Sequence, residues 1–240
     1  MTEATLQDLS GLAVRSAKIF ELLKPHVHGA DRSGSAYAKT LVCLCAEVLN
    51  ALNSLADAHS KSQVQHTAWL SRNLLELLIW CEYCAASESN AQAFSRDTAK
   101  DALGFVNAFE KLAFMIPAQD NAGMIVEAKR ALSAIAAAES FELDDEFKKV
   151  HDAAKELSHE HSVMFRNLNI ILSKLMHPTA YMVNTYVDDV SKTGFIDMIY
   201  KIGSALAVAA LDALEKAPIV ADSQHLQPTE SGVAYAKPGS

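Results

Sequence analysis

The sequence predicts an all-α protein, a mostly antiparallel bundle of long helices. Glycine and proline, which interrupt helices, number only 9 and 6 in 240 residues. Long uninterrupted segments carry apolar residues at steps of three and four, the period of a helix with one buried face. No convincing run alternates apolar and polar residues as a half-buried strand would. These observations favour helices from the N-terminus to about residue 217.

Two central segments show the helical period most clearly. The first apolar stripe consists of Leu41, Leu44, Val48, Leu52 and Leu55, and the second of Leu70, Leu74, Leu77, Cys81 and Cys84. The turn-rich run HVHGADRSGS after Pro25 separates the first of these segments from an N-terminal helix. The sequence therefore predicts three helices at about residues 3–24, 35–58 and 62–88.

Proline and turn residues divide the second half of the chain. Pro117 and Pro178 end helices because proline lacks an amide donor and clashes with the preceding turn. Ser140 to Asp145 mark a further turn. The expected helices lie at about residues 91–114, 119–138, 144–177 and 193–216. We expect residues 1–217 to form one helical domain and residues 218–240, which are polar and aperiodic, to form a flexible tail.

Composition limits the class of protein. The chain has 21 Lys and Arg against 29 Asp and Glu, a net charge of -8, and half of its residues are hydrophobic. A disordered chain would be less hydrophobic, and a nucleic-acid coat would be strongly basic. The first residues lack the apolar core of a secretory signal, so we expect a cytoplasmic protein. The most apolar stretch, Ile202 to Leu214, is shorter than the about 20 residues of a membrane span, so we expect none.

The four cysteines form two close pairs, Cys43 with Cys45 and Cys81 with Cys84. In a reducing cytosol both pairs are expected to be thiols. The second pair has the CxxC spacing of redox and zinc sites, but it lies in the helical run LLELLIWCEYC without a second CxxC. We interpret these cysteines as buried structural thiols.

The third predicted helix contains a candidate site. Glu76 is surrounded by leucine, isoleucine and tryptophan, and a carboxylate is costly to bury alone. Arg72 lies four residues earlier on the same helical face, where the two side chains can pair. Two readings stay open: an ion pair that fixes helix packing, or half of a polar site in the bundle.

A second candidate site lies at the end of the helix predicted at 144–177. Ser173 and His177 are four residues apart, and Arg166 has nearly the same azimuth. Pro178 places His177 at or just beyond the helix C-terminus, where the helix dipole favours a protonated imidazole. Such a histidine could bind an anion, move a proton, or only cap the helix. The sequence does not show whether Arg72, Glu76 and His177 converge.

Known catalytic and metal motifs are absent. His159 and His161 point to different sides of a helix, and there is neither HExxH nor a pair of Glu-x-x-His motifs. The sequence also lacks GxGxxG, a Walker loop and GxSxG. We therefore predict no metal and no cofactor.

The segments SRNLLELLIWCEYC and FRNLNIILSKLMHPTA resemble an uncharacterised family of bacterial helical proteins placed near the HEPN-like domains. In that family an Arg-x-x-x-Glu helix is followed by a later helix ending in Ser-x-x-x-His-Pro. The resemblance covers about residues 65–95 and 145–185. It implies that the family's polar positions correspond to Arg72, Glu76, Ser173 and His177. We take Arg72, Glu76 and His177 as candidate catalytic residues and Ser173 as a candidate ligand-binding residue.

The resemblance implies a HEPN-like fold and a polar pocket for an anionic or nucleotide-like ligand, in a bacterial defence or stress setting. Better-understood HEPN domains are often metal-independent ribonucleases, with Arg and His about five residues apart. Here Arg166 precedes His177 by eleven residues, about 16 Å of helix, too far for both to hold one phosphate. The alternatives are a non-catalytic module that forms a homodimer and a metal-independent ribonuclease with an RNA ligand. Whether the protein is an enzyme stays open.

Overall fold

The computed structural model describes residues 3–27, 35–113, 121–139, 141–143, 148–177 and 189–225. These residues form helices and contain no strand, which confirms the predicted all-α class. The helices are α1 (Glu3–Val27), α2 (Ala36–Ser60), α3 (Val64–Ala86), α4 (Glu88–Ala113), α5 (Asn121–Glu139), α6 (Val150–Leu157), α7 (His159–Met176), α9 (Asp189–Glu215) and α10 (Pro218–His225).

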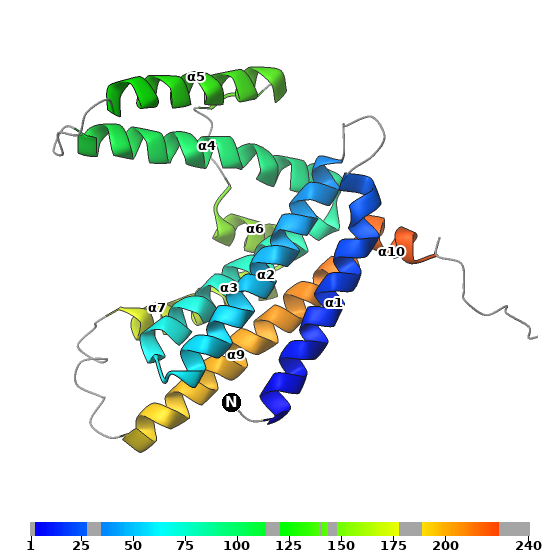
Figure 1. Ribbon diagram of the computed structural model, residues 1–240, viewed down its shortest axis with the longest axis vertical. Helices are drawn as coiled ribbons and strands as arrows, with labels where there is room; N and C mark the ends of the chain where they lie inside the picture. The colour runs from blue at the N-terminus through cyan, green and yellow to red at the C-terminus, as the bar shows by residue number, and fades with distance from the viewer. Residues whose placement is uncertain are drawn as a thin grey trace, which may run out of the picture.

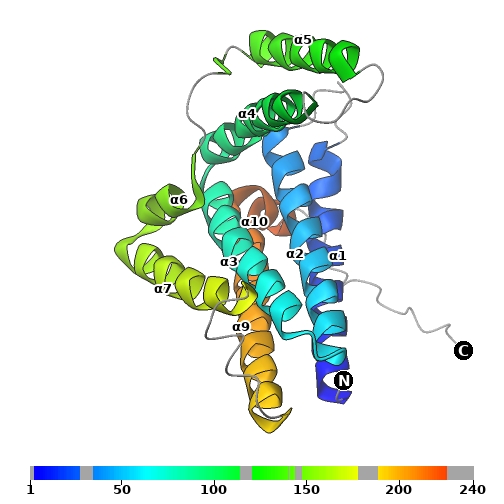
Figure 2. The same cartoon turned by 90° about the vertical axis from the view of Figure 1, so that its left-hand side faces the viewer.

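Helix α3 is the centre of the bundle. It packs against α2, α9 and α7 along its length and against α4 and α6 near its C-terminal end. Helices α1, α2, α3 and α9 run along the long axis of the molecule (Figure 1). The pair α4 and α5 lies across one end of these four helices, and α7 crosses the bundle on one side (Figure 2).

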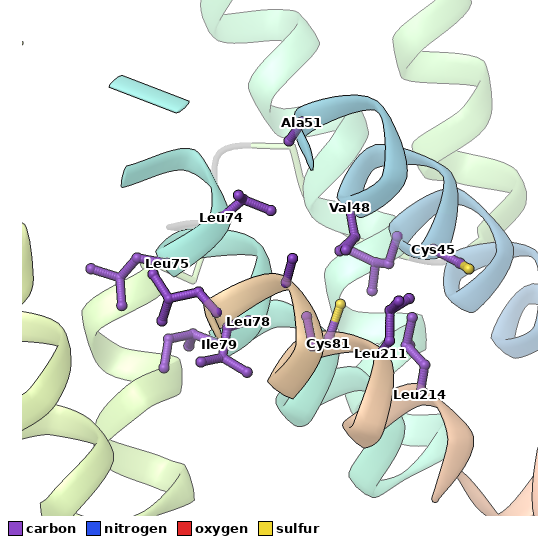
Figure 3. Packing of buried hydrophobic residues seen from close by; sticks show 14 of the residues in the cluster. Cys45, Val48, Ala51, Leu74, Leu75, Leu78, Ile79, Cys81, Leu211 and Leu214 are labelled. Atoms are coloured by element: carbon purple, nitrogen blue, oxygen red, sulfur yellow. The ribbon is translucent and has the colours of Figure 1, made fainter. Parts of the chain in front are cut away.

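The apolar stripes predicted from the sequence form the core. All five stripe residues of α2 are buried, and so are the stripe residues of α3 except Leu77, which is partly buried against the core. Leu211 and Leu214 of α9 close the third side of this cluster (Figure 3). Burial of each such side chain contributes about 1.5–3 kcal/mol, so the core accounts for much of the folding free energy.

Helices α3 and α9 approach closely and run parallel. A Cβ on Gly203 would lie 2.5 Å from Ser71 Oγ and 2.7 Å from Leu55 Cδ2, so any larger residue here would force these side chains to shift. The Ser71 hydroxyl donates to the carbonyl of Ile199 at 3.1 Å. The parallel orientation is an exception to the mostly antiparallel arrangement predicted. It arises because α7 runs antiparallel to α3 and returns the chain to the end where α3 begins (Figure 1).

The helix predicted at 144–177 is wrong as a single element. Residues 144–147 lie outside the described residues, and the remainder forms two helices, α6 and α7, separated at Ser158. The Ser158 backbone is extended, with φ -172° and ψ 167°, and its hydroxyl accepts a hydrogen bond from the amide of His161. Serine at an N-cap favours the start of a new helix. The helix therefore breaks at Ser158, although the apolar helical period continues across it.

The tail predicted from residue 218 also begins too early. Residues Pro218–His225 form α10, which packs against α1 with Val220 fully buried. His26 Nε2 lies 2.9 Å from Ser223 Oγ and joins the two helices. An eight-residue helix is too short to show a period, although Pro218 stands at the first helical position, where proline is favoured. The remaining residues, 226–240, lie outside the described residues.

Among the described residues, two helical segments are long and apolar enough to cross a membrane by length and composition, Ala36–Ser60 and Thr193–Glu215. Both are central helices of the bundle, and core helices of soluble proteins meet the same criterion. The finding is weak evidence for a membrane span. The expected absence of a span stays a prediction.

Candidate functional site

The Arg72–Glu76 pair predicted from the sequence is present. Arg72 Nη2 lies 2.9 Å from Glu76 Oε1, one turn along α3. Arg72 Nε also donates to Asn169 Oδ1 on α7 at 2.8 Å. The two charged side chains are 31% and 33% exposed, so the pair lies at the edge of the α3–α7 contact and not inside the core. Two partners on different helices fix the guanidinium, which in turn orients the Glu76 carboxylate.

His177 occupies the predicted place at the end of α7. Its backbone is extended, with φ -90° and ψ 151°, as expected for a residue before proline, and its amide donates to the Ser173 carbonyl at 3.2 Å. The imidazole is exposed. His177 follows Asn169, the partner of Arg72, by eight residues, or about 12 Å of helix rise.

The structure therefore brings together only part of the predicted site. Within the part of the chain that the structure describes, no hydrogen bond or ion pair joins the side chain of His177 or Ser173 to Arg72 or Glu76. Arg72 and Glu76 share a site with Asn169, a residue that the sequence did not single out. Little in the sequence indicated Asn169, because it is one of several polar residues in the segment FRNLNIILSK.

A pocket of about 420 Å³ opens beside Glu76. It lies between α3, α4 and the residues that lead into α6. Its lining consists of Glu76, Trp80, Phe94, Asp97, Thr98, Asp101, Lys148, Lys149 and Val150. We call it the Glu76 pocket. Only Glu76 among its lining residues was a predicted site residue.

The apolar wall of the Glu76 pocket is aromatic. The rings of Trp80 on α3 and Phe94 on α4 have centroids 4.7 Å apart and planes tilted by 47°. Both side chains are partly buried and pack against the hydrophobic core. The core therefore holds these two rings in place at the edge of an open volume.

Two aspartates of α4 form the acidic part of the lining. Asp97 accepts a hydrogen bond from the backbone amide of Lys148 at 3.0 Å and lies 3.5 Å from Lys100 Nζ. Its side chain is 13% exposed. Burial, together with the charge of Asp97, raises the pKa of Asp101 above its ordinary value. Asp101 is exposed and lies one turn further along α4.

Two consecutive lysines face the aspartates. The Lys148 ammonium forms an ion pair with Glu156 and lies 4.9 Å from the centroid of the Tyr83 ring. Burial lowers the pKa of Lys148, but the hydrogen bonds and charges of Glu156 and Tyr83 outweigh burial and raise it. Lys149 stands at the N-cap of α6 and is exposed. The Glu76 pocket therefore combines aromatic, acidic and basic groups.

A polar cluster that sequence reasoning missed joins α7 to α3. His161 Nδ1 lies 2.7 Å from Ser158 Oγ, and His161 Nε2 lies 2.9 Å from Glu82 Oε2. Glu82 and His161 also line a second pocket of about 440 Å³. The Ser-x-x-His spacing could have indicated the cap, but Glu82 is 79 positions from His161 and no local pattern connects them.

The four cysteines are free thiols, as predicted, and three of them are buried. Burial raises the pKa of Cys45 to about 11 and that of Cys84 to about 12, and it raises the pKa of Cys81 well above its ordinary value. Raised thiol pKa values suppress the reactive thiolate, which favours the structural interpretation. Among the described residues, no group of three or more His, Cys, Asp or Glu could hold a metal ion.

The fold and the site define the chain as an all-helical bundle with a polar pocket beside its central helix. Comparisons with protein-family models, curated proteins and solved structures found no match. The resemblance to the HEPN-like family stays a prediction.

Proposed function

We propose that the protein binds a nucleotide-like ligand in the Glu76 pocket. The observation that supports this proposal is the lining, in which Trp80 and Phe94 stand beside carboxylates and lysines around about 420 Å³. Ligand pockets typically have volumes of about 300–1,000 Å³ and combine an apolar wall with a few polar groups. The volume and the lining both meet this description.

The lining of the Glu76 pocket offers partners for the base and for the phosphate of a nucleotide. A base can stack on the Trp80 and Phe94 rings, and such stacking contributes about 1–3 kcal/mol for each base. Asp97 and Asp101 can accept hydrogen bonds from an N–H group of a base, either an exocyclic amino group or, in uracil, the ring N–H. Lys149 is exposed at the rim and can attract phosphate.

The charges argue against a bare anion as the ligand. Three of the lining residues are carboxylates and two are lysines, and Lys148 already pairs with Glu156. A carboxylate repels an anion at short range, so the base has to provide most of the affinity. In this proposal Arg72 is a positioning residue, because it holds Glu76 at the pocket and does not line the pocket itself.

A HEPN-like identity and a role in bacterial defence or stress are also proposals, and they rest on the sequence resemblance alone. A metal-independent ribonuclease would need a basic group and His177 at one phosphate. The geometry gives this alternative no separate support, because the contacts of Arg72 are with Glu76 and Asn169.

Tryptophan fluorescence tests the proposed binding directly. The chain has two tryptophans, and Trp69→Phe leaves Trp80 as the reporter. We expect adenine, guanine, cytosine or uracil nucleotides to change Trp80 emission in a saturable way, whereas inorganic phosphate alone should not. Asp101→Asn should weaken binding by roughly tenfold, the value of a hydrogen bond to a charged group.

The matched control is Asp57→Asn, which changes an exposed carboxylate on α2 outside the pocket. It should leave the affinity unchanged. If none of the four nucleotide classes changes Trp80 emission up to millimolar concentration, the proposal is wrong. Equal weakening by the two aspartate variants would also contradict it, because the effect would then be one of overall charge.

A further inference from the structure

The outer part of α4 carries an exposed apolar stripe. Phe105, Phe109 and Leu112 are spaced by four and three residues and therefore lie on one face of the helix. They are 72%, 45% and 51% exposed. The Phe105 and Phe109 rings stack with centroids 6.2 Å apart. A contiguous apolar surface of this kind usually marks an interaction site.

The stripe faces away from α5, the helix that packs along α4. Lys129 of α5 pairs with Glu110 of α4, so α5 lies on the Glu110 side of α4. By the 100° step of a helix, Phe105 and Leu112 lie about 140° and 160° around α4 from Glu110, and Phe109 lies about 100° from it, so the stripe does not face α5. Figures 1 and 2 show α4 and α5 side by side across the end of the bundle, with α4 nearer to it. No described helix covers the stripe.

The charge of this region identifies the kind of partner. Residues 102–113 and 121–138 contain the acids Glu110 and Glu127 and the bases Lys111, Lys129 and Arg130, whereas the whole chain has a net charge of -8. A nucleic acid or an anionic membrane would require a strongly basic surface. A nearly neutral apolar stripe on an acidic protein is instead where two copies meet with least repulsion.

The exposed area agrees with a small dimer interface. An aromatic side chain buries about 150–250 Å², so the stripe provides roughly 300 Å² in each copy. Two such stripes supply about 600 Å² of the about 1,000 Å² that the smallest specific complexes bury, and the polar residues around the stripes have to supply the rest. Ala108, which is small and exposed, lies beside the stripe and lets the two helices approach.

We propose that a second copy of the chain docks on this stripe, α4 against α4, in a two-fold symmetric dimer. The same patch on both copies is the usual geometry of a homodimer. The dimer does not depend on the proposed ligand, because the stripe residues do not line the Glu76 pocket. Interfaces of this small size are typical of weak, transient complexes, so we expect a dissociation constant in the micromolar range.

Sedimentation equilibrium of the full chain tests this proposal. We expect a mass that rises from monomer to dimer between about 1 and 500 μM, a range that brackets the expected constant. Phe105→Glu should raise the dissociation constant by at least 100-fold, because it places a charge at the centre of the interface. Val14→Glu is the matched control, because Val14 is 67% exposed on α1, outside the stripe, and should leave the dimer intact.

A cross-linking experiment locates the interface. In a Cys43→Ser background, which removes the one exposed thiol, Ala108→Cys should form an intermolecular disulfide under mild oxidation. A monomer at all concentrations would overturn the proposal, and so would a dimer that Phe105→Glu leaves unchanged. Circular dichroism and melting of each variant confirm that the chain stays folded.

Discussion

Arg72 has the contacts that the proposed positioning role requires, because it links two side chains, one on α3 and one on α7. Its guanidinium contacts Glu76 on its own helix and Asn169 on α7. His177 has a different environment, since its imidazole is exposed at the end of α7 and is not bonded to Glu76 among the described residues. The two predicted site residues therefore differ in what their removal would disturb.

This difference gives a prediction for stability. Arg72→Met removes two partner contacts and leaves Glu76 and Asn169 without their donor, so it should lower the free energy of unfolding by about 1–2 kcal/mol. The pair is about one third exposed, and solvent screening keeps the loss from being larger. His177→Ala should change stability by less than about 1 kcal/mol, because a helix-end charge contributes only about 0.3–1 kcal/mol. Urea denaturation of both variants makes the comparison.

A loss of several kcal/mol in His177→Ala would show that the imidazole has a buried partner. In that case the description of His177 as an exposed helix-end residue would be wrong. An effect of Arg72→Met no larger than that of His177→Ala would contradict the positioning role of Arg72.

At the scale of elements, the close contact between α3 and α9 depends on Gly203, which has no side chain. Gly203→Ala would place a Cβ within 3 Å of Ser71 Oγ and Leu55 Cδ2. Overpacking of a core costs about 1–3 kcal/mol, and the better helix propensity of alanine returns only about 1 kcal/mol. We expect Gly203→Ala to lower stability by about 1–2 kcal/mol in thermal or urea unfolding.

Gly194 is the control on the same helix. No atom lies within 4 Å of the Cβ that Gly194→Ala would add, so this substitution should stabilise the protein by up to about 1 kcal/mol. Ser71→Ala removes the nearest obstacle to the new methyl group. The double variant should therefore lose less stability than the sum of its two single variants. Additive losses of stability would show that the side chains between α3 and α9 move aside for the methyl group more easily than the distances indicate.

The helices were predictable from the sequence because their signals are local. The stripe from Leu41 to Leu55 repeats every three or four residues, and the Arg72–Glu76 pair needs only the four-residue step of a helix. The Glu76 pocket needs Trp80 and Asp97 from different helices together with Lys148. No local pattern encodes such a convergence, because it depends on how α4 and α6 pack on α3.

The predicted helix boundaries were wrong where the helical period of apolar residues did not decide where a helix begins or ends. Ser158 interrupts an apolar pattern that continues on both sides of it, and its hydroxyl caps α7. Val220 is a single buried residue in a short helix, so its burial against α1 has no periodic signature. The helix break at Ser158 and the burial of Val220 can be predicted only when the packing of the neighbouring helices is known.

At the scale of the whole molecule, the cysteines report on the integrity of the bundle. Cys43 is exposed on α2, whereas Cys45 of α2 and Cys81 and Cys84 of α3 are buried in the hydrophobic core. A thiol reacts as its thiolate, and burial both raises the pKa of these three thiols and blocks access to them. Labelling of the three should therefore require opening of the core.

We expect a thiol reagent at pH 8 to modify one cysteine for each native chain and all four in denaturant. The three slow thiols should react at one common rate if the bundle opens as a unit, because they come from two helices of one core. Gly203→Ala should accelerate that rate by about tenfold for each 1.4 kcal/mol of stability that it removes, while the fast reaction of Cys43 stays unchanged. Separate rates for Cys45 and Cys81, measured by mass spectrometry of labelled peptides, would instead show that α2 detaches from α3 before the bundle unfolds.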